Sequence, residues 1–186
     1  STCRRRSRSD RSTSSAKRSC RACEGRDERG SGSAGPSEPT SRERVSREGE
    51  ILNRDLLGSA RVAHLATSDQ YARPHVVPVV FVYEHPYLYT PIDRKPKEVH
   101  WRDLRRVRNV VTNGRASVVV DVWDEDWSKL RYVLLEGTAD VLEAGAEHDH
   151  AIALLEAKYP QYGELSLEGC PVIRVNVEHR AEWTAR

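Results

Sequence analysis

Residues 115–142 read RASVVVDVWDEDWSKLRYVLLEGTADVL. Ala116–Val122 is a strongly apolar, β-branched run, and Leu130–Leu142 is a second, longer one, so both stretches predict β-strands. The acidic segment Trp123–Ser128, which bears two tryptophans, predicts the loop between them. Gly137 interrupts the second strand, where a glycine is typical of a β-bulge. This pair of long strands indicates a β-rich domain.

The segments on either side predict shorter strands and three helices. The expected strands are Arg61–Thr67, Pro74–Tyr83, Tyr87–Ile92 and Pro171–Trp183, and the expected helices are 42–57, 98–113 and 146–159. Asn113-Gly114 closes the second helix, and Pro78 predicts an edge or a bulge because proline cannot donate to a ladder. Antiparallel hairpins with a few helices indicate a mainly β (α+β), barrel-like fold and not a parallel sheet.

The chain divides into a tail, residues 1–44, and a folded domain, residues 45–186. The tail contains no Val, Ile, Leu, Met, Phe, Tyr or Trp. Such a segment cannot bury enough apolar surface to offset the entropy lost on ordering, so we expect it to be disordered. Residues 1–40 carry a net charge of +5 and the remainder −3. Binding of nucleic acid by the folded domain is therefore not favoured.

The cysteines do not predict a disulfide framework. Cys20 and Cys23 have the spacing of a metal or redox pair, but the tail contains no histidine to complete a zinc site, so we interpret them as free thiols. Cys170 stands alone before a proline. The expected location is a reducing cytoplasm. No apolar run in the sequence is long enough to span a membrane.

The histidines and the common catalytic motifs predict no catalytic centre. G-x-S-x-G, the P-loop and G-x-G-x-x-G are all missing, so the catalytic residues stay unassigned. His148 and His150 have no third ligand nearby, and we expect a solvated pair and no metal site. His64 lies among apolar residues of a predicted strand, so we expect its side chain to be partly buried with its hydrogen bonds satisfied. For His75 a structural role and a binding role both stay open.

Cations are densest after the strand that ends at Ile92. One group follows the strand end and another lies on the next helix: Arg94, Lys95 and Lys97, then Arg105, Arg106 and Arg108. Cations that converge from a strand end and a helix suit a phosphate or the acidic tail of a cofactor. The alternative is a solvated basic helix face.

Several stretches in order resemble the pyridoxamine 5′-phosphate oxidase-like superfamily. They are Arg73-Pro-His-Val-Val-Pro-Val-Val-Phe, Leu88-Tyr-Thr-Pro-Ile-Asp with Lys95-Pro-Lys, Leu104-Arg-Arg-Val-Arg-Asn, Arg115-Ala-Ser with Asp121 and Asp126-Trp-Ser, and Leu135-Glu-Gly-Thr-Ala. The order and spacing over residues 47–184 carry the resemblance. More narrowly, the chain looks like the branch of probable coenzyme F420-dependent enzymes.

The resemblance implies a split β-barrel of the FMN-binding type that forms a homodimer with two cofactor sites at the interface. Carried over by position, backbone groups of Val77, Pro78 and Val79 would line the cofactor ring. Tyr89, Thr90 and Pro91 would approach the ring edge and phosphate, while Lys95, Lys97 and Arg106 would bind phosphate with support from Asn109. Trp127 would reach the site from the acidic loop, from the same or the other subunit.

The resemblance leaves the cofactor and substrate partly open. The expected function is F420-dependent hydride transfer between the deazaflavin and a small unsaturated organic molecule. The alternatives are an FMN-dependent oxidoreductase of the same fold and a non-catalytic barrel that binds a flavin or haem. Residues 177–184 supply no obvious equivalent of the substrate-phosphate residues of pyridoxamine phosphate oxidases. Oxidation of pyridoxamine phosphate itself is therefore not expected.

Overall fold

The computed structural model describes residues 55–93 and 100–185. Residues 55–59 are helical and lead into the first strand. The sheet strands are β1 (Ala63–Ser68), β2 (Pro74–Val79), β3 (Val82–Glu84), β4 (Tyr87–Pro91), β5 (Arg115–Val122), β6 (Arg131–Leu142) and β7 (Val172–Thr184). The α-helices that follow β1 are α2 (Arg105–Asn113) and α3 (Ala146–Lys158), and 3₁₀ turns lie at Trp101–Asp103, Trp127–Lys129 and Pro160–Gly163.

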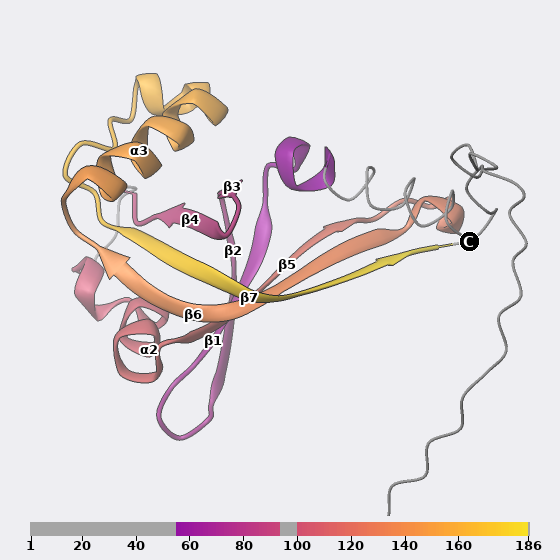
Figure 1. The fold of residues 1–186 in the computed structure, drawn as a ribbon, viewed down its shortest axis with the longest axis horizontal. Coiled ribbons are helices and arrows are strands. Elements are labelled where there is room, and N and C mark those ends of the chain that lie inside the picture. Colours follow the sequence, from indigo (N-terminus) through magenta and orange to yellow (C-terminus); the bar gives the residue numbers. More distant parts are fainter. Residues whose placement is uncertain (1–54, 94–99, 186) are drawn as a thin grey trace, which may run out of the picture. The chain divides into compact units, whose positions relative to one another are not determined.

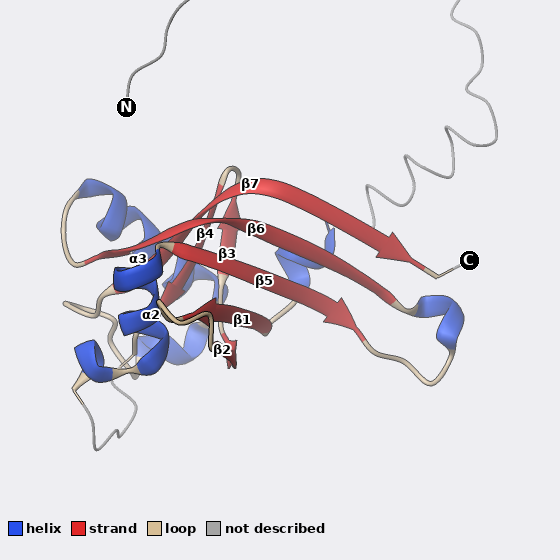
Figure 2. Cartoon of the chain, turned by 90° about the horizontal axis from the view of Figure 1, so that it is seen from below, coloured by secondary structure: helices blue, strands red, loops and turns tan. Residues whose placement is uncertain are grey.

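The described strands form one antiparallel sheet in the order β2-β1-β5-β6-β7-β4-β3. The sheet is strongly curled: β5, β6 and β7 run side by side, and β1 and β2 cross their direction (Figure 1). In the view from below, the ends of β5 and β6 project beyond the helices as a long hairpin (Figure 2). The expectation of a mainly β fold built from antiparallel hairpins is confirmed.

The stretch predicted as one strand, Pro74–Tyr83, is two strands. β2 ends at Val79 and β3 begins at Val82, with Phe81 fully buried between them. The backbone N–H of Phe81 donates to the Tyr159 hydroxyl at 3.0 Å, and this hydroxyl lies 2.8 Å from the Phe81 carbonyl oxygen. A side chain therefore satisfies both backbone groups, and the ladder ends there. Pro78 lies in β2 at the edge of the sheet, as predicted.

Both ends of α2 have a local cause. The helix predicted over 98–113 begins only at Arg105, because Leu104 is extended with ψ 129° after the 3₁₀ turn; residues 98 and 99 lie outside the described residues. It ends at Gly114, whose φ of 70° and N–H bond to the Val110 carbonyl form a left-handed cap. Neither α2 nor any other described helix has the length and apolar character needed to cross a membrane.

Gly137 marks the predicted bulge. The register between β6 and β7 shifts between Glu136 and Gly137. A Cβ at position 137 would overlap the backbone carbonyl oxygen of Asn176 on β7. Only glycine allows the two backbones to approach this closely, so the bulge bends β6 over the core.

The main core lies on one face of the sheet, which we call the inner face and which carries Leu65, Val118 and Leu135. These three side chains are completely buried, and Val107 and Val110 of α2 cover them. A second, smaller cluster joins β4 to α3 and the segment after it: Tyr89, Ala151, Leu155, Tyr159, Tyr162, Leu167, Cys170 and Val172. The two clusters hold α2 and the end of β4 in fixed positions.

Candidate functional site

The N-terminus of α2 carries cations where a helix usually carries acids. Leu104 precedes the helix and has no polar side chain to cap it, and the first turn contains no acidic residue. Arg105 and Arg106 occupy that turn. A helix start with free N–H groups and two guanidinium groups is a favourable place for an anion.

Arg105 and Arg106 leave the helix in different directions. Arg106 is partly buried; burial lowers its pKa, and the nearby Asp93 carboxylate opposes that shift. Arg105 instead reaches β2, where its guanidinium lies 3.4 Å from the Pro74 carbonyl oxygen. The structure therefore separates two cationic positions that are adjacent in sequence.

His75 is the β2 residue that faces this helix start. It lies opposite Thr67 of β1 and is half-buried. Burial lowers the pKa of His75, and the positive charges of Arg105 and Arg106 lower it further. The imidazole is therefore held neutral near pH 7 and can both donate and accept a hydrogen bond.

The predicted β4 residues are all buried. The Tyr89 hydroxyl donates to Glu147 of α3 at 3.0 Å, and burial together with Glu147 raises the pKa of this phenol. Glu147 also accepts from Arg174 at 2.5 Å, and this contact lowers the pKa of its carboxyl. Thr90 and Pro91 end the strand two residues before Asp93. Tyr89 thus points to α3, while the end of β4 points to the start of α2.

The other predicted residues lie in three places. Val77 and Val79 pack against the main core, whereas Pro78 is exposed on the opposite face of β2. Asn109 is buried and donates to the Thr67 hydroxyl at 3.0 Å. Lys95 and Lys97 lie outside the described residues.

Trp127 does not join the other predicted residues within one chain. It is 70% exposed in the loop between β5 and β6, while α2 leads into the other end of β5. Trp123 in the same loop is equally exposed, and nearby Tyr132 stacks on Trp183 with ring centroids 5.9 Å apart. The hairpin end is therefore an exposed aromatic surface.

Two expectations about histidines were wrong. His148 is buried, because the first turn of α3 packs against the Cys170 loop and places its Nε2 2.9 Å from the Cys170 carbonyl oxygen. His64 is exposed and its Nδ1 lies 3.4 Å from Asp121, because strand alternation turns it away from the core. Residues 55–93 and 100–185 contain no cluster of three or more His, Cys, Asp or Glu side chains suited to a metal ion.

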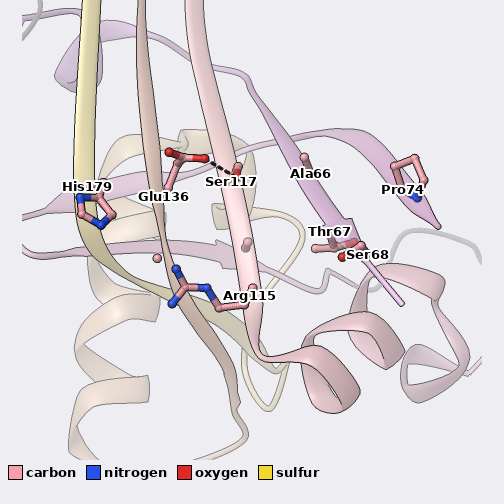
Figure 3. A pocket seen from close by; sticks show the side chains of 10 residues that line it. Ala66, Thr67, Ser68, Pro74, Arg115, Ser117, Glu136 and His179 are labelled. Carbon is pink, nitrogen blue, oxygen red and sulfur yellow. Dashed lines mark hydrogen bonds between the residues drawn. The ribbon is translucent and has the colours of Figure 1, made fainter. Parts of the chain in front are cut away.

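A hollow of about 340 Å³ lies on the other face of the sheet, which we call the outer face and which carries Ala66, Ser117, Val119, Leu134 and Glu136. Ser117 donates to Glu136 at 3.2 Å, and His179 lies beside Glu136 on β7 (Figure 3). The sequence did not identify these outer-face residues as a candidate site. The signal was the alternation of the two long strands, which places these side chains on one face.

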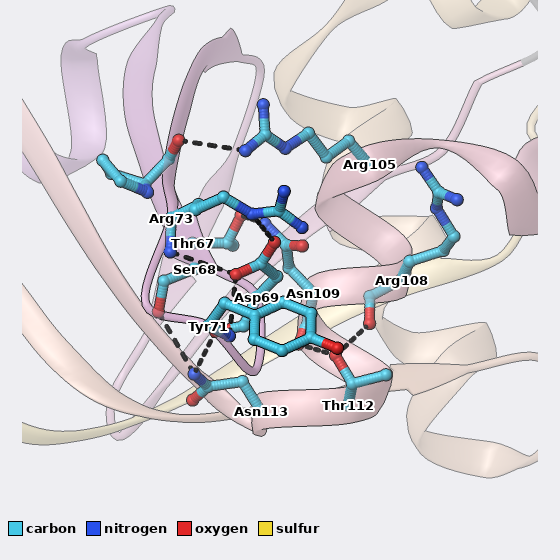
Figure 4. A network of polar contacts seen from close by, with 11 residues as sticks. Thr67, Ser68, Asp69, Tyr71, Arg73, Arg105, Arg108, Asn109, Thr112 and Asn113 are labelled. Carbon is cyan, nitrogen blue, oxygen red and sulfur yellow. Dashed lines mark hydrogen bonds and ion pairs between the residues drawn. The ribbon is translucent and has the colours of Figure 1, made fainter.

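A second pocket, of about 470 Å³, lies between the β1–β2 turn and α2 (Figure 4). Its lining residues are Asp69, Gln70, Tyr71, Arg73, Arg105, Arg108, Asn109 and Thr112. The helical spacing of Arg105 and Arg108 predicted a shared face. Sequence reasoning gave no role to Arg73, which reaches the pocket only because the turn folds back toward α2.

The curled antiparallel sheet of the described residues, with α2 covering its core, defines a split β-barrel. Residues 52–183 match the family model of pyridoxamine 5′-phosphate oxidase. The chain belongs to this family, whose members include flavin-binding oxidoreductases. The resemblance inferred from the sequence motifs is thereby confirmed at the level of family and fold.

Solved structures show the same fold. A haem storage protein from Vibrio cholerae matches with 19% identity and a TM-score of 0.57, over 74% of this chain and 93% of that one. A conserved hypothetical protein from Mycobacterium tuberculosis matches with 18% identity and a TM-score of 0.58, over 75% and 85%. A putative 5-nitroimidazole resistance protein from Bacteroides thetaiotaomicron matches with 17% identity and a TM-score of 0.54, over 73% and 83%. The comparison with curated proteins gave no match.

Proposed function

We propose that this chain binds coenzyme F420, a phosphorylated deazaflavin, and transfers a hydride between it and a small unsaturated organic substrate. The observation that carries the proposal is the convergence of Arg106, His75 and the end of β4 at the uncapped start of α2. Membership in a family that includes flavin-binding oxidoreductases supports it.

The described residues fit the phosphate of such a cofactor. The first-turn N–H groups of α2 and the Arg106 guanidinium offer hydrogen-bond donors. Charge-assisted hydrogen bonds of this kind hold phosphates strongly. In this proposal Asn109 acts indirectly: its bond to Thr67 fixes α2 against β1.

The described residues also fit the ring. β2 pairs with β1 on one side only and is the last strand of the sheet, so the backbone of Val77–Val79 presents an open edge. N–H and carbonyl groups on such an edge can pair with the polar rim of a flavin-like ring. Pro78 presents its ring to the outer face.

When bound, the cofactor would supply the hydride chemistry. The role of the protein is to hold the substrate against the cofactor in the orientation that hydride transfer needs, and to exclude water. Neutral His75 can hold a hydrogen bond at this site. We do not assign Tyr89 as the proton donor, because its hydroxyl donates to Glu147 and burial raises its pKa. The proton then comes from solvent or through His75.

Fluorescence titration of the full chain with F420 and with FMN tests the proposal. We expect saturable binding of F420, weaker binding of FMN, and at least about tenfold weaker F420 binding in Arg106→Gln, which removes a charge-assisted contact. Arg102→Gln is the matched control, since Arg102 precedes α2 and pairs with Glu143. Tight FMN binding with no affinity for F420 would assign the chain to the FMN-dependent alternative.

We also propose that the chain is a homodimer with the cofactor sites at the interface. Part of the outer face is apolar: Val119 and Leu134 are only half-buried, and Val76 is 58% exposed among the described residues. A two-fold contact through this face would bury those side chains and let Trp127 of each copy reach the other. We also infer that the protein is located in a reducing cytoplasm. The buried free thiol of Cys170 is consistent with that location.

One observation favours haem binding as a second candidate function. His179 lines the outer-face hollow together with Arg115, whose guanidinium donates to Glu178 at 2.8 Å, so a candidate imidazole ligand lies in this pocket beside a paired cation. A structural relative is a haem storage protein. A haem titration followed by visible spectroscopy tests this. A Soret shift that His179→Ala abolishes and His150→Ala keeps would support it, and an unchanged spectrum would rule it out.

A further inference from the structure

The pocket between the β1–β2 turn and α2 is built for an anion that the cofactor phosphate does not account for. Arg105, Arg108 and Thr112 lie on the exposed side of α2, opposite its buried Val107 and Val110. Figure 4 shows the guanidinium groups of Arg73 and Arg105 above Asp69, with that of Arg108 set apart on the other side of Tyr71.

Two of the three arginines lack an acidic partner within the described part of the chain. Among the described residues, the Arg105 guanidinium makes one hydrogen bond, the 3.4 Å contact with the Pro74 carbonyl oxygen. The Arg108 guanidinium makes no hydrogen bond to the described residues. They are three residues apart on the helix, so their side chains are neighbours. Like charges at this spacing repel one another, and an anion between them relieves that repulsion.

The third arginine is held in place by the turn. One oxygen of Asp69 accepts the backbone N–H groups of Tyr71 and Arg73, at 2.9 and 3.0 Å, and the other accepts the Arg73 Nε at 2.7 Å. These bonds lower the pKa of Asp69, so it stays ionised. The Tyr71 ring lies 5.2 Å from the Arg73 guanidinium. The terminal amino groups of Arg73 remain directed to the pocket.

The side chains that line this pocket carry a net positive charge. Three guanidinium groups and one carboxylate line the pocket, and the neutral side chains of Gln70, Tyr71, Asn109 and Thr112 complete it. The pocket is also separate from the proposed phosphate position, because Arg106 turns toward Asp93 and does not line it. A cofactor with a single phosphate would leave this pocket open.

We infer that the pocket of Arg73, Arg105 and Arg108 binds a dianion, such as a pair of carboxylates, outside the cofactor-phosphate position. This inference rests in part on the proposed function, since the ligand is either the acidic tail of the deazaflavin or a free polycarboxylate substrate. Both present the same chemistry: carboxylates spaced for paired contacts with guanidinium groups.

The experiment measures four affinities of the full chain by isothermal titration at fixed low ionic strength. The probes are F420, the same phosphorylated deazaflavin without its glutamate tail, FMN and citrate. The variants are Arg105→Gln and Arg108→Gln, each with its lysine counterpart, and the control is Arg102→Gln. Circular dichroism at the start of each titration checks that every variant is folded.

We expect each glutamine variant to weaken binding of tailed F420 or of citrate about tenfold or more, and to change FMN and tailless deazaflavin affinity less than about twofold. The lysine variants should restore part of the loss. A loss confined to F420 assigns the pocket to the tail, and a loss confined to citrate assigns it to a free substrate. Equal affinities in the glutamine variants and Arg102→Gln would overturn the inference. Absence of any flavin or deazaflavin binding, with citrate binding intact, would instead refute only the proposed function.

Discussion

The two faces of the sheet differ both in their side chains and in how far these are buried. On the inner face, Leu65, Val118 and Leu135 are completely buried beneath α2. On the outer face, Val119 and Leu134, their neighbours in sequence, are only half-buried by the described residues. The outer face also carries Ser117, Asp121 and Glu136, so apolar and polar side chains alternate with one another on it. The difference indicates that the inner face stabilises the single chain, whereas the outer face is the surface that the proposed homodimer would cover.

The sharpest test of this comparison uses two adjacent leucines. Leu135→Ala removes a fully buried side chain, and we expect it to lower the free energy of unfolding by about 2–5 kcal/mol. Leu134→Ala is the matched change on the outer face and should cost about 1 kcal/mol or less in the monomer. Urea unfolding at one low protein concentration measures both. Equal losses would show that the two faces do not differ.

A charge on the outer face should separate the copies without unfolding them. Val119→Asp would place an unpaired carboxylate in the proposed contact and weaken dimerisation about a hundredfold or more. Val111→Asp is the control, since Val111 is exposed on α2. Analytical ultracentrifugation measures the dissociation constant. A Val119→Asp protein that stays dimeric would place the interface elsewhere.

The inner face becomes polar where Thr67 meets α2. Thr67→Val removes the acceptor of the buried Asn109 amide, and we expect a loss of about 1–3 kcal/mol in unfolding free energy. If Asn109 only positions α2, the KM for the cofactor should rise while kcat changes little. The control is Thr138→Val, whose side chain is exposed on β6 and lines neither pocket. A drop in kcat at unchanged KM would contradict a positioning role.

The last test concerns a cation packed on aromatic rings near the second core cluster. Lys158 lies 4.1 Å from the Phe81 ring centroid, and burial, followed by the charge of Arg61, lowers its pKa to about 8. Between pH 8 and about 10.5 the unfolded state therefore binds more protons than the folded state. Wild-type stability should rise relative to Lys158→Met over this window, measured by urea unfolding. Parallel pH profiles would show that Lys158 keeps its ordinary pKa.

Most of the fold was predictable because it depends on local signals. Alternation and β-branched runs predicted the strands to within a few residues, Gly114 marked a helix end, and Gly137 marked a bulge. The break at Phe81 was not predictable, because a hydroxyl 78 residues away satisfies its backbone. The late start of α2 had a similar cause: the helical pattern runs through Leu104, but the 3₁₀ turn before it ends in an extended residue.

The candidate site was predictable only in part. The sequence pointed to the cations on α2 and to the end of β4, since both follow elements that the pattern located. It did not show that Tyr89 would turn to Glu147, or that Arg105 and Arg106 would diverge. Those outcomes depend on which side of β4 meets α3 and on which side of α2 meets the β1–β2 turn.

By itself the sequence determined the class of fold, the family and the segments that carry charge, because periodicity, turn residues and ordered motifs are local properties. The tertiary structure decided which cations share a pocket. Arg73, Arg105 and Arg108 meet because a five-residue turn held by Asp69 folds against one face of α2. Contacts between residues about 30 positions apart follow from packing of the chain, and no local pattern encodes them.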